Sequence, residues 1–189
     1  MVPPTTTAPN DLWTADFKGR VRTGNGVYCF SLTIADQHTR SLLASQGLLS
    51  TQPVTARPGF ERVFREDGLP RAIRTDSGVP FATQAVHGLS FLNVWWIRLR
   101  IQDQRIHPGR PQENGAHERM PRTLKRQAVR PVRRTRTAQQ RAFDAFRRED
   151  NTVRPHEWLN QDTPASRYAS SPAPARPGSR RSSTPATSR

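Results

Sequence analysis

The sequence predicts a single mixed α/β domain in which a sheet of about five strands is flanked by helices. Three observations predict it: alternating apolar residues near the N-terminus, a hairpin signal at Gly24–Gly26, and a change to helical spacing from Phe60 onward. The chain has 189 residues, enough for one ordinary domain of about 100–150 residues with tails. Since only 33% of the residues are hydrophobic, we expect one modest core.

The first three strands are predicted to form an antiparallel meander. Leu12–Lys18 alternates apolar and polar residues, and Gly24–Gly26 is typical of a tight hairpin turn. Val27–Ala35 is rich in β-branched and aromatic residues, as a second strand would be. Asp36–His38 predicts the next turn and Arg40–Ala44 the third strand.

Helical spacing follows the meander. Phe60, Val63 and Phe64 stand at i, i+3 and i+4, which predicts a helix covering the sheet, ended by Gly68 and Pro70.

The next elements are predicted to be a short strand and a second helix. The strand spans Arg71–Thr75, and the apolar face of the helix consists of Leu92, Trp95, Trp96 and Leu99. Because these aromatic residues have the spacing of a core stripe, we expect them to pack inside the domain rather than to stack on bases.

The last third of the core is predicted to be mainly helical. Arg105–His107 predicts a brief strand, Pro108–Asn114 a loop and Ala116–Gln127 a helical stretch interrupted by Pro121. The last predicted helix opens with a capping box at Thr137 and Gln140 and buries Phe143 and Phe146.

Composition divides the chain into three parts. Residues 1–10 are rich in Pro and Thr and predict a flexible N-terminal segment. Residues 11–168 predict the core domain with a C-terminal helical extension. Residues 169–189 are rich in Ser, Pro and Arg with little apolar content, so we expect a disordered tail.

The charge of the chain indicates a polyanionic partner. Its formal net charge is +15, and 28 of its 30 basic residues are arginines. From Arg98 to the C-terminus there are 21 basic and 8 acidic residues, a net charge of +13. Nucleic acid is the default partner of such a segment. The alternative is that arginine enrichment reflects a GC-rich genome.

Several classes of protein are excluded by the sequence. It has no run of roughly 20 apolar residues, so we expect no membrane span, and its N-terminus lacks the features of a secretory signal. Cys29 is the single cysteine, which excludes an internal disulfide and a multi-cysteine zinc site. We therefore expect a reducing, cytoplasmic setting.

Three carboxylates are candidates for a metal site. Asp16 lies on the polar face of the first strand, Asp76 at the end of the fourth, and Glu118 near the start of the later helical stretch. If the first and fourth strands are neighbours and that stretch packs across their ends, the carboxylates converge. Hard oxygen ligands of this kind bind Mg²⁺, and two such ions assist phosphodiester chemistry. Taken singly, an aspartate such as Asp76 is most often a turn residue, and a glutamate such as Glu118 is most often a solvated charge on a helix.

An ordered set of motifs carries a resemblance to a known family. The motifs are Trp13–Gly19, Asp36–Ser41, Gly68–Phe81, Pro108–Met120 and Arg154–Glu157. Together they resemble the integrase core domain of bacterial insertion-sequence DDE transposases, which are relatives of retroviral integrases with an RNase H-like fold. The resemblance covers roughly Leu12 to Tyr168.

The resemblance implies a catalytic and metal-binding role for Asp16, Asp76 and Glu118. The implied cofactor is a pair of Mg²⁺ or Mn²⁺ ions. Asp36, by contrast, belongs to a recurrent turn. The implied reaction is nicking at transposon ends by a metal-activated water, followed by attack of the freed 3′-hydroxyl on target DNA. A homo-multimer and a bacterial, nucleoid-associated location are also implied.

Basic and polar residues around these carboxylates are candidates for DNA contact, since neutralising phosphates dominates affinity for DNA. Lys18 shares the strand face of Asp16, and Asn114 precedes the helix that would carry Glu118. The remaining candidates are Arg122, Lys125, Arg126, Arg133 and Arg134. The alternative for the basic residues is a solvated surface.

The chain departs from the family pattern at several positions. Pro121 lies inside the expected helix of Glu118, where proline costs about 3 kcal/mol, so that helix could begin at Pro121 instead. Ser77 stands where the family usually has Asn, Arg100 stands at a helix end that would suit Gly, and Asp150 replaces an aromatic.

The family usually carries an N-terminal helix-turn-helix region. We expect either that another chain recognises the ends or that this chain is a remnant. Two alternatives to an active transposase therefore stay open: a catalytically inactive remnant that only binds nucleic acid, and an RNase H-like nuclease unrelated to transposition.

Overall fold

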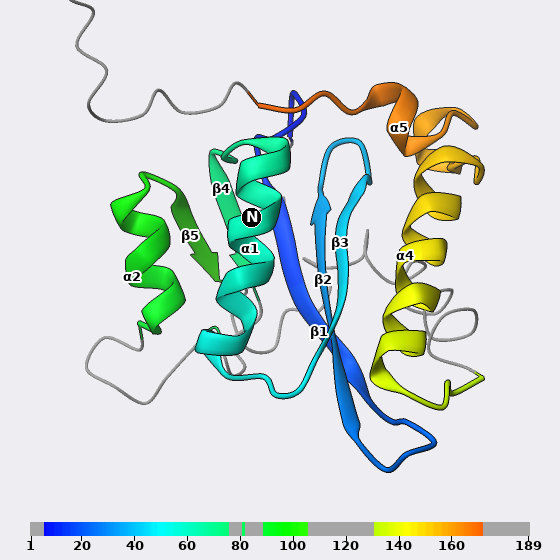
Figure 1. The fold of residues 1–189 in the computed structure, drawn as a ribbon. Helices are drawn as coiled ribbons and strands as arrows, with labels where there is room; N and C mark the ends of the chain where they lie inside the picture. The colour runs from blue at the N-terminus through cyan, green and yellow to red at the C-terminus, as the bar shows by residue number, and fades with distance from the viewer. Residues whose placement is uncertain (1–5, 76–80, 82–88, 106–130, 172–189) are drawn as a thin grey trace, which may run out of the picture.

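A five-stranded mixed sheet forms the centre of the molecule. The computed structural model describes residues 6–75, 81, 89–105 and 131–171. The strands are arranged in the order β3-β2-β1-β4-β5, with antiparallel β1–β2 and β2–β3 pairs and parallel β1–β4 and β4–β5 pairs (Figure 1). Their bounds are Trp13–Arg22 (β1), Tyr28–Asp36 (β2), Leu42–Leu48 (β3), Ala72–Thr75 (β4) and Gln102–Arg105 (β5). The predicted fold class and its antiparallel meander are confirmed.

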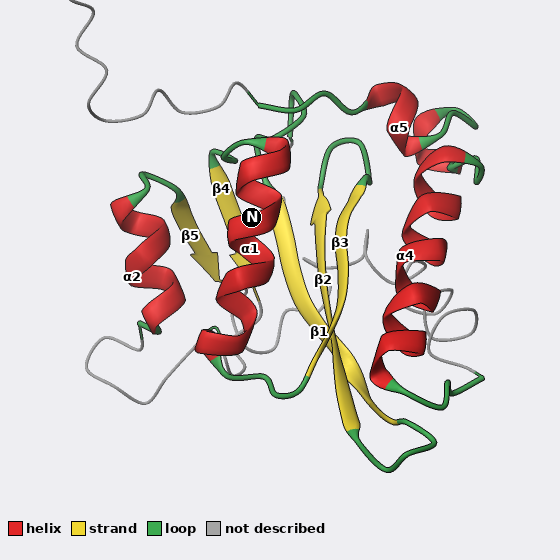
Figure 2. Ribbon diagram, viewed as in Figure 1, coloured by secondary structure: helices red, strands yellow, loops and turns green. Residues whose placement is uncertain are grey.

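Helices flank this sheet (Figure 2). They are α1 (Pro53–Asp67), α2 (Phe91–Arg98), α4 (Arg136–Thr152) and α5 (Pro164–Arg167), with a 3-10 turn at Glu157–Leu159. Because side chains alternate along a strand, the two faces of β2 contribute residues to two different hydrophobic clusters. Leu32 and Ile34 pack with α1 and α2, whereas Cys29 and Ala35 pack with α4.

The helix predicted around Phe60 is confirmed as α1. Phe60, Val63 and Phe64 are buried, and the helix ends at Gly68, whose N–H donates to the carbonyl of Phe64. Fully burying each such side chain contributes about 1.5–3 kcal/mol. The predicted stripe therefore fixes α1 against the sheet.

The helix α2 confirms the predicted aromatic stripe. Trp96 is fully buried and lies edge-on to Phe60, with ring centroids 5.1 Å apart. Ser90 and Asn93 form a reciprocal capping box at its N-terminus. At its other end Arg100 has a φ of 62°, the left-handed conformation for which Gly would be better suited, as predicted.

The capping box predicted at Thr137 and Gln140 is wrong. The N-cap is Thr135, whose side chain accepts a hydrogen bond from the N–H of Ala138. Gln140 is unavailable for a cap because its amide binds the backbone of β3. Phe143 and Phe146 are buried, as predicted.

Two strand boundaries differ from the sequence prediction. β3 begins at Leu42 rather than Arg40, because Arg40 has a φ of 64° and belongs to the turn. β5 spans Gln102–Arg105 and so begins three residues before the predicted Arg105–His107. In the part of the chain that the structure describes, no helix is long and apolar enough to cross a membrane.

Candidate catalytic edge and basic surface

Asp16 lies on β1, where the sheet changes from antiparallel to parallel pairing. On one side Asp16 pairs with Thr33 of β2, and the hydroxyl of Thr33 donates to the carbonyl of Asp16 (3.2 Å). On the other side β1 pairs with β4, and the last paired residues are Ala15 and Thr75. Asp16 therefore lies one residue beyond the last pair with β4, and it is half-buried.

A β-bulge lies between Phe17 and Arg20, a short way along β1 from Asp16. Phe17 pairs with Leu32 and the next pair is Arg20 with Phe30, so β1 carries one extra residue here. Gly19 has a φ of 89°, which glycine adopts without strain. Bulges are common beside active sites, where they redirect the strand. Lys18 belongs to β1, and its side chain lies outside the described part of the structure.

The other predicted metal ligands, Asp76 and Glu118, lie outside the described residues, as do Ser77 and Pro121. The same holds for the DNA-contact candidates Asn114, Arg122, Lys125 and Arg126. Within the described ranges, no three His, Cys, Asp or Glu side chains are grouped so that they could bind a metal. Asp16 is the only one of the three carboxylates in those ranges, so the predicted triad stays a prediction.

Arg133 and Arg134 lie beside the turn between β1 and β2. The N–H of Gly24 donates to the carbonyl of Arg133 (3.0 Å), and the N–H of Asn25 donates to that of Arg134 (2.9 Å). The hairpin and the start of α4 are thus joined through their backbones. Sequence reasoning missed this junction, because nothing in the local pattern around Gly24 indicates a partner more than 100 residues away.

Asp36 is a structural residue, as expected for its turn. Its buried carboxylate accepts hydrogen bonds from the N–H of Asn10 (2.8 Å) and from the N–H and hydroxyl of Thr39 (2.7 and 2.8 Å). With all these donors directed at it, the carboxylate holds the turn closed and the N-terminal segment against the sheet.

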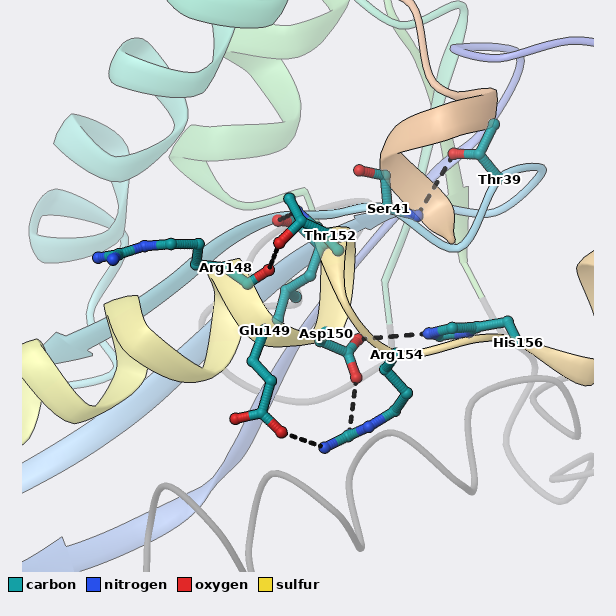
Figure 3. A network of polar contacts seen from close by, with 10 residues as sticks. Thr39, Ser41, Arg148, Glu149, Asp150, Thr152, Arg154 and His156 are labelled. Carbon is teal, nitrogen blue, oxygen red and sulfur yellow. Dashed lines mark hydrogen bonds and ion pairs between the residues drawn. The ribbon is translucent and has the colours of Figure 1, made fainter. Parts of the chain in front are cut away.

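Asp150 is a second buried carboxylate away from the candidate metal site. It forms an ion pair with Arg154 (2.9 Å), which also contacts Glu149 (3.2 Å), and His156 lies 3.8 Å away (Figure 3). Burial raises the pKa of Asp150, and the basic neighbours oppose that shift. Asp150, which stands where an aromatic residue was expected, is therefore part of a buried polar network.

Comparison with known proteins supplies relatives for this arrangement. An integrase core domain model matches residues 99–164. An insertion element IS407 protein of Burkholderia multivorans is 29% identical over 177 residues, which are 89% of this chain and 60% of that protein. An insertion element IS476 protein of Xanthomonas euvesicatoria is 30% identical over 161 residues, 83% of this chain and 44% of that protein. The chain thus spans about half the length of these relatives.

Retroviral proteins are also similar. The Gag-Pol polyprotein of baboon endogenous virus is 30% identical over 119 residues, 62% of this chain and 6% of the polyprotein. Among solved structures, the simian T-cell lymphotropic virus intasome in complex with PP2A regulatory subunit B56 gamma has a TM-score of 0.70 and 18% identity, covering 96% of this chain and 62% of the other. The HTLV-2 integrase catalytic core domain in complex with magnesium has a TM-score of 0.66 and 13% identity, covering 87% and 100%.

The two kinds of similarity agree. The insertion-element proteins match most of this chain in sequence, and the retroviral integrase cores match its fold. The chain is thus similar in sequence to insertion-element proteins, matches the integrase core domain over residues 99–164, and has the fold of retroviral integrase cores.

Proposed function

We propose that this chain is the catalytic core of a DDE-type transposase, which nicks DNA at the ends of a mobile element and joins them to target DNA. The observation that carries the proposal is the register of β1 and β4. Ala15 and Thr75 are paired in parallel strands, and the residues that follow them in the sequence are Asp16 and Asp76, which we propose as two metal ligands. Neighbouring strands are about 4.8 Å apart, a separation that allows two carboxylates to share a metal ion.

The residues proposed for this site fit a hard divalent cation. Asp16 offers carboxylate oxygens from a half-buried position, and we propose that Asp76 and Glu118 complete the ligand set for Mg²⁺ or Mn²⁺, in two ions. When bound, such ions activate a water nucleophile and stabilise the leaving oxygen of a phosphodiester. The protein's own contribution is to hold the ligands in position. The pairing of β1 with β2 on one side and β4 on the other favours this for Asp16.

Other parts of the proposal concern partners. DNA as the partner, both transposon end and target, is supported by the net charge of +15 and by the match of residues 99–164 to the integrase core domain. Lys18, Asn114, Arg122, Lys125, Arg126, Arg133 and Arg134 are the proposed contacts. We propose a homo-multimer as the active form, since HTLV-2 integrase cores have been solved in dimeric and trimeric forms. A cytoplasmic, nucleoid-associated location follows from the same function.

The test is metal-dependent nicking of supercoiled plasmid DNA. We expect the wild type to nick in Mg²⁺ or Mn²⁺ and not in EDTA, and Asp16→Asn to lose at least 100-fold in rate, because removing a ligand charge weakens metal binding and transition-state stabilisation. Glu61→Gln is the matched control, since this carboxylate is exposed on α1 and its pairing with Arg57 contributes little.

The competing function is nucleic-acid binding without catalysis. A wild-type chain that binds DNA in a salt-dependent manner but never nicks it, or an Asp16→Asn variant that nicks as fast as the wild type, would contradict the proposed reaction. Circular dichroism of each variant shows whether its fold is intact.

A further inference from the structure

Five arginines flank the end of the β1–β2 hairpin, where it meets the start of α4. Because Val21 and Cys29 pack on the α4 side, Arg20 and Arg22 lie on the opposite face of the hairpin. Arg20 and Arg22 come from β1, and Arg133, Arg134 and Arg136 come from the segment that enters α4. We call these five residues the hairpin tip. The hairpin projects beyond the helical layers, and α4 begins beside it (Figure 1).

The backbone fixes the two halves of the hairpin tip to each other. Besides the hydrogen bonds from Gly24 and Asn25 to Arg133 and Arg134, a Cβ on Gly24 would lie 3.2 Å from the Cα of Arg134. This is tighter than an ordinary van der Waals contact, so a side chain at position 24 would have to move the two segments apart by a few tenths of an ångström. The arginines are thus presented by a rigid platform rather than by a loose tail.

The hairpin tip is strongly and uniformly positive. No acidic residue occurs from 17 to 35 or from 131 to 143, and none of the five arginines forms an ion pair with another described residue. Four of them are exposed, and Arg133 is half-buried. Clustered like charges repel each other, so a polyanion that neutralises them gains binding energy from the same arrangement.

Tyr28 orders part of this cluster. The guanidinium groups of Arg20 and Arg22 lie over its ring, at 5.0 and 5.9 Å from the centroid, and Arg22 also donates to the carbonyl of Gly26 (3.2 Å). Their planar donors are therefore held in place before a ligand arrives, which lowers the entropy cost of binding phosphate. Because guanidinium groups cover the ring of Tyr28, it is a poor platform for an unstacked base.

We propose that the hairpin tip binds the phosphate backbone of duplex DNA at a second position, away from the chemistry at Asp16. Arg22 follows Asp16 by six residues of β1, a distance of about 20 Å along an extended strand. At 3.4 Å per nucleotide, this distance corresponds to about six phosphates of one DNA strand. The contact is independent of base sequence, since guanidinium groups directed at phosphates position DNA without reading it.

This inference rests on the proposed function for its choice of DNA, and its test is separate from catalysis. Binding of a 30-base-pair duplex is measured in EDTA between 50 and 200 mM salt, where no nicking can occur. Arg20→Gln/Arg134→Gln is compared with Arg65→Gln/Arg148→Gln, which removes the same charge from exposed positions on α1 and α4. Arg20→Lys/Arg134→Lys keeps the charge at the tip.

We expect the hairpin-tip glutamine variant to bind roughly tenfold more weakly at 100 mM salt, with the salt slope lowered by about 2. The lysine variant should recover most of this loss, and the control should bind as the wild type does. The inference would be overturned if the control bound DNA as weakly as the tip variant, or if the tip variant kept the salt slope of the wild type. It would also be overturned if the wild type bound no duplex, or if the tip variant lost affinity only for RNA of the same length.

Catalysis distinguishes this inference from the proposed function. At limiting DNA the hairpin-tip variant should nick more slowly in Mg²⁺, in proportion to its weaker binding, whereas Asp16→Asn should bind DNA normally in EDTA. If the wild type did not nick DNA but the tip variants still bound DNA more weakly than the wild type, only the proposed reaction would be overturned.

Discussion

Asp150 is buried in α4, and its charged form is disfavoured there. Arg154 and His156 face it from the following turn, and Glu149 lies beside it on the same helix. Burial outweighs the attraction of the basic groups and raises the pKa of Asp150 above its ordinary value of 3.8. The folded protein therefore retains this proton at a pH at which the unfolded chain has already lost it.

The sign of the resulting pH dependence follows from linkage. Between the ordinary and the raised pKa the folded state binds more protons, so the contribution of Asp150 to the free energy of unfolding falls as pH rises. Asp150→Asn abolishes this titration. We expect the stability of the variant relative to the wild type to increase from pH 3.5 to pH 7, as measured by urea unfolding.

The basic neighbours supply the control for this experiment. Asp150→Asn/His156→Gln removes the group 3.8 Å from the carboxylate, and the same trend relative to His156→Gln would assign the effect to burial rather than to the histidine. A relative stability that is constant or decreases with pH would show that the ion pair with Arg154 prevails over burial.

At the scale of elements, α4 completes the hydrogen bonding of an edge strand. β3 is at one edge of the sheet, so one side of its backbone has no strand partner among the residues that the structure describes. The side chain of Asn151 accepts from the N–H of Leu42 (2.8 Å) and donates to its carbonyl (3.0 Å), as a neighbouring strand would. Gln140 binds the N–H of Gly47 (2.8 Å) and the carbonyl of Ser45 (3.0 Å).

This arrangement needs a close approach between helix and strand. A Cβ on Gly47 would lie only 2.5 Å from the sulfur of Cys29 and 3.3 Å from the ring of Phe143. Glycine at this position therefore lets α4 come near enough for its side chains to reach the strand. The covered edge is also protected from pairing with other chains, the usual hazard of an open strand.

We expect Asn151→Leu to lower the free energy of unfolding by about 1–3 kcal/mol, because the backbone N–H and carbonyl of Leu42 lose their partners where α4 shields them. The variant should also aggregate more readily on heating. Urea unfolding and light scattering measure the two effects.

Thr152→Val is the neighbouring control for this variant. It removes an exposed hydrogen bond within α4, to the carbonyl of Arg148, and should change stability by no more than about 0.5 kcal/mol. If both variants lost the same stability, the bonds from Asn151 to β3 would contribute nothing of their own.

The elements differ in how far the sequence predicts them. Alternation in Leu12–Lys18 and helical spacing at Phe60 and Trp96 predict the sheet and two helices, because apolar burial is periodic. The edge contacts of α4 were not predictable, since polar residues on a helix ordinarily face solvent. Asp16 could be placed on the first strand, but neither the bulge after it nor the register with β4 has a local sequence signal.

At the scale of the whole molecule, the two ends of the described chain meet. The amide of Asn10 donates to the carbonyl of Ala169 (2.8 Å), and its oxygen accepts from the hydroxyl of Tyr168 (2.9 Å). The N–H of Ser171 donates to the carbonyl of Asp67 at the end of α1 (2.8 Å). Burial and the nearby carboxylates raise the pKa of Tyr168, which keeps its phenol neutral and able to donate.

These contacts bear on the proposed domain boundaries, 11–168 for the core with flexible segments on either side. Tyr168 packs against the main hydrophobic cluster, and the bonds of Ala169 and Ser171 continue past the proposed limit. We expect a chain ending at Ser171 to be as stable as the full chain. A chain ending at Arg167 should lose about 2–4 kcal/mol, because it lacks a partly buried aromatic ring and four hydrogen bonds, including the one from the N–H of Tyr168 to the carbonyl of Pro164.

Thermal and urea unfolding of the two truncated chains measure this difference, and Tyr168→Phe in the chain ending at Ser171 separates its causes. That variant keeps the ring and loses only the hydroxyl bond, so it should be destabilised by about 1 kcal/mol. Equal stability of the two truncated chains would place the boundary before Tyr168. A loss in the shorter chain alone would show that the segment after α5 ties the C-terminal extension to α1, and with it to the sheet that carries Asp16.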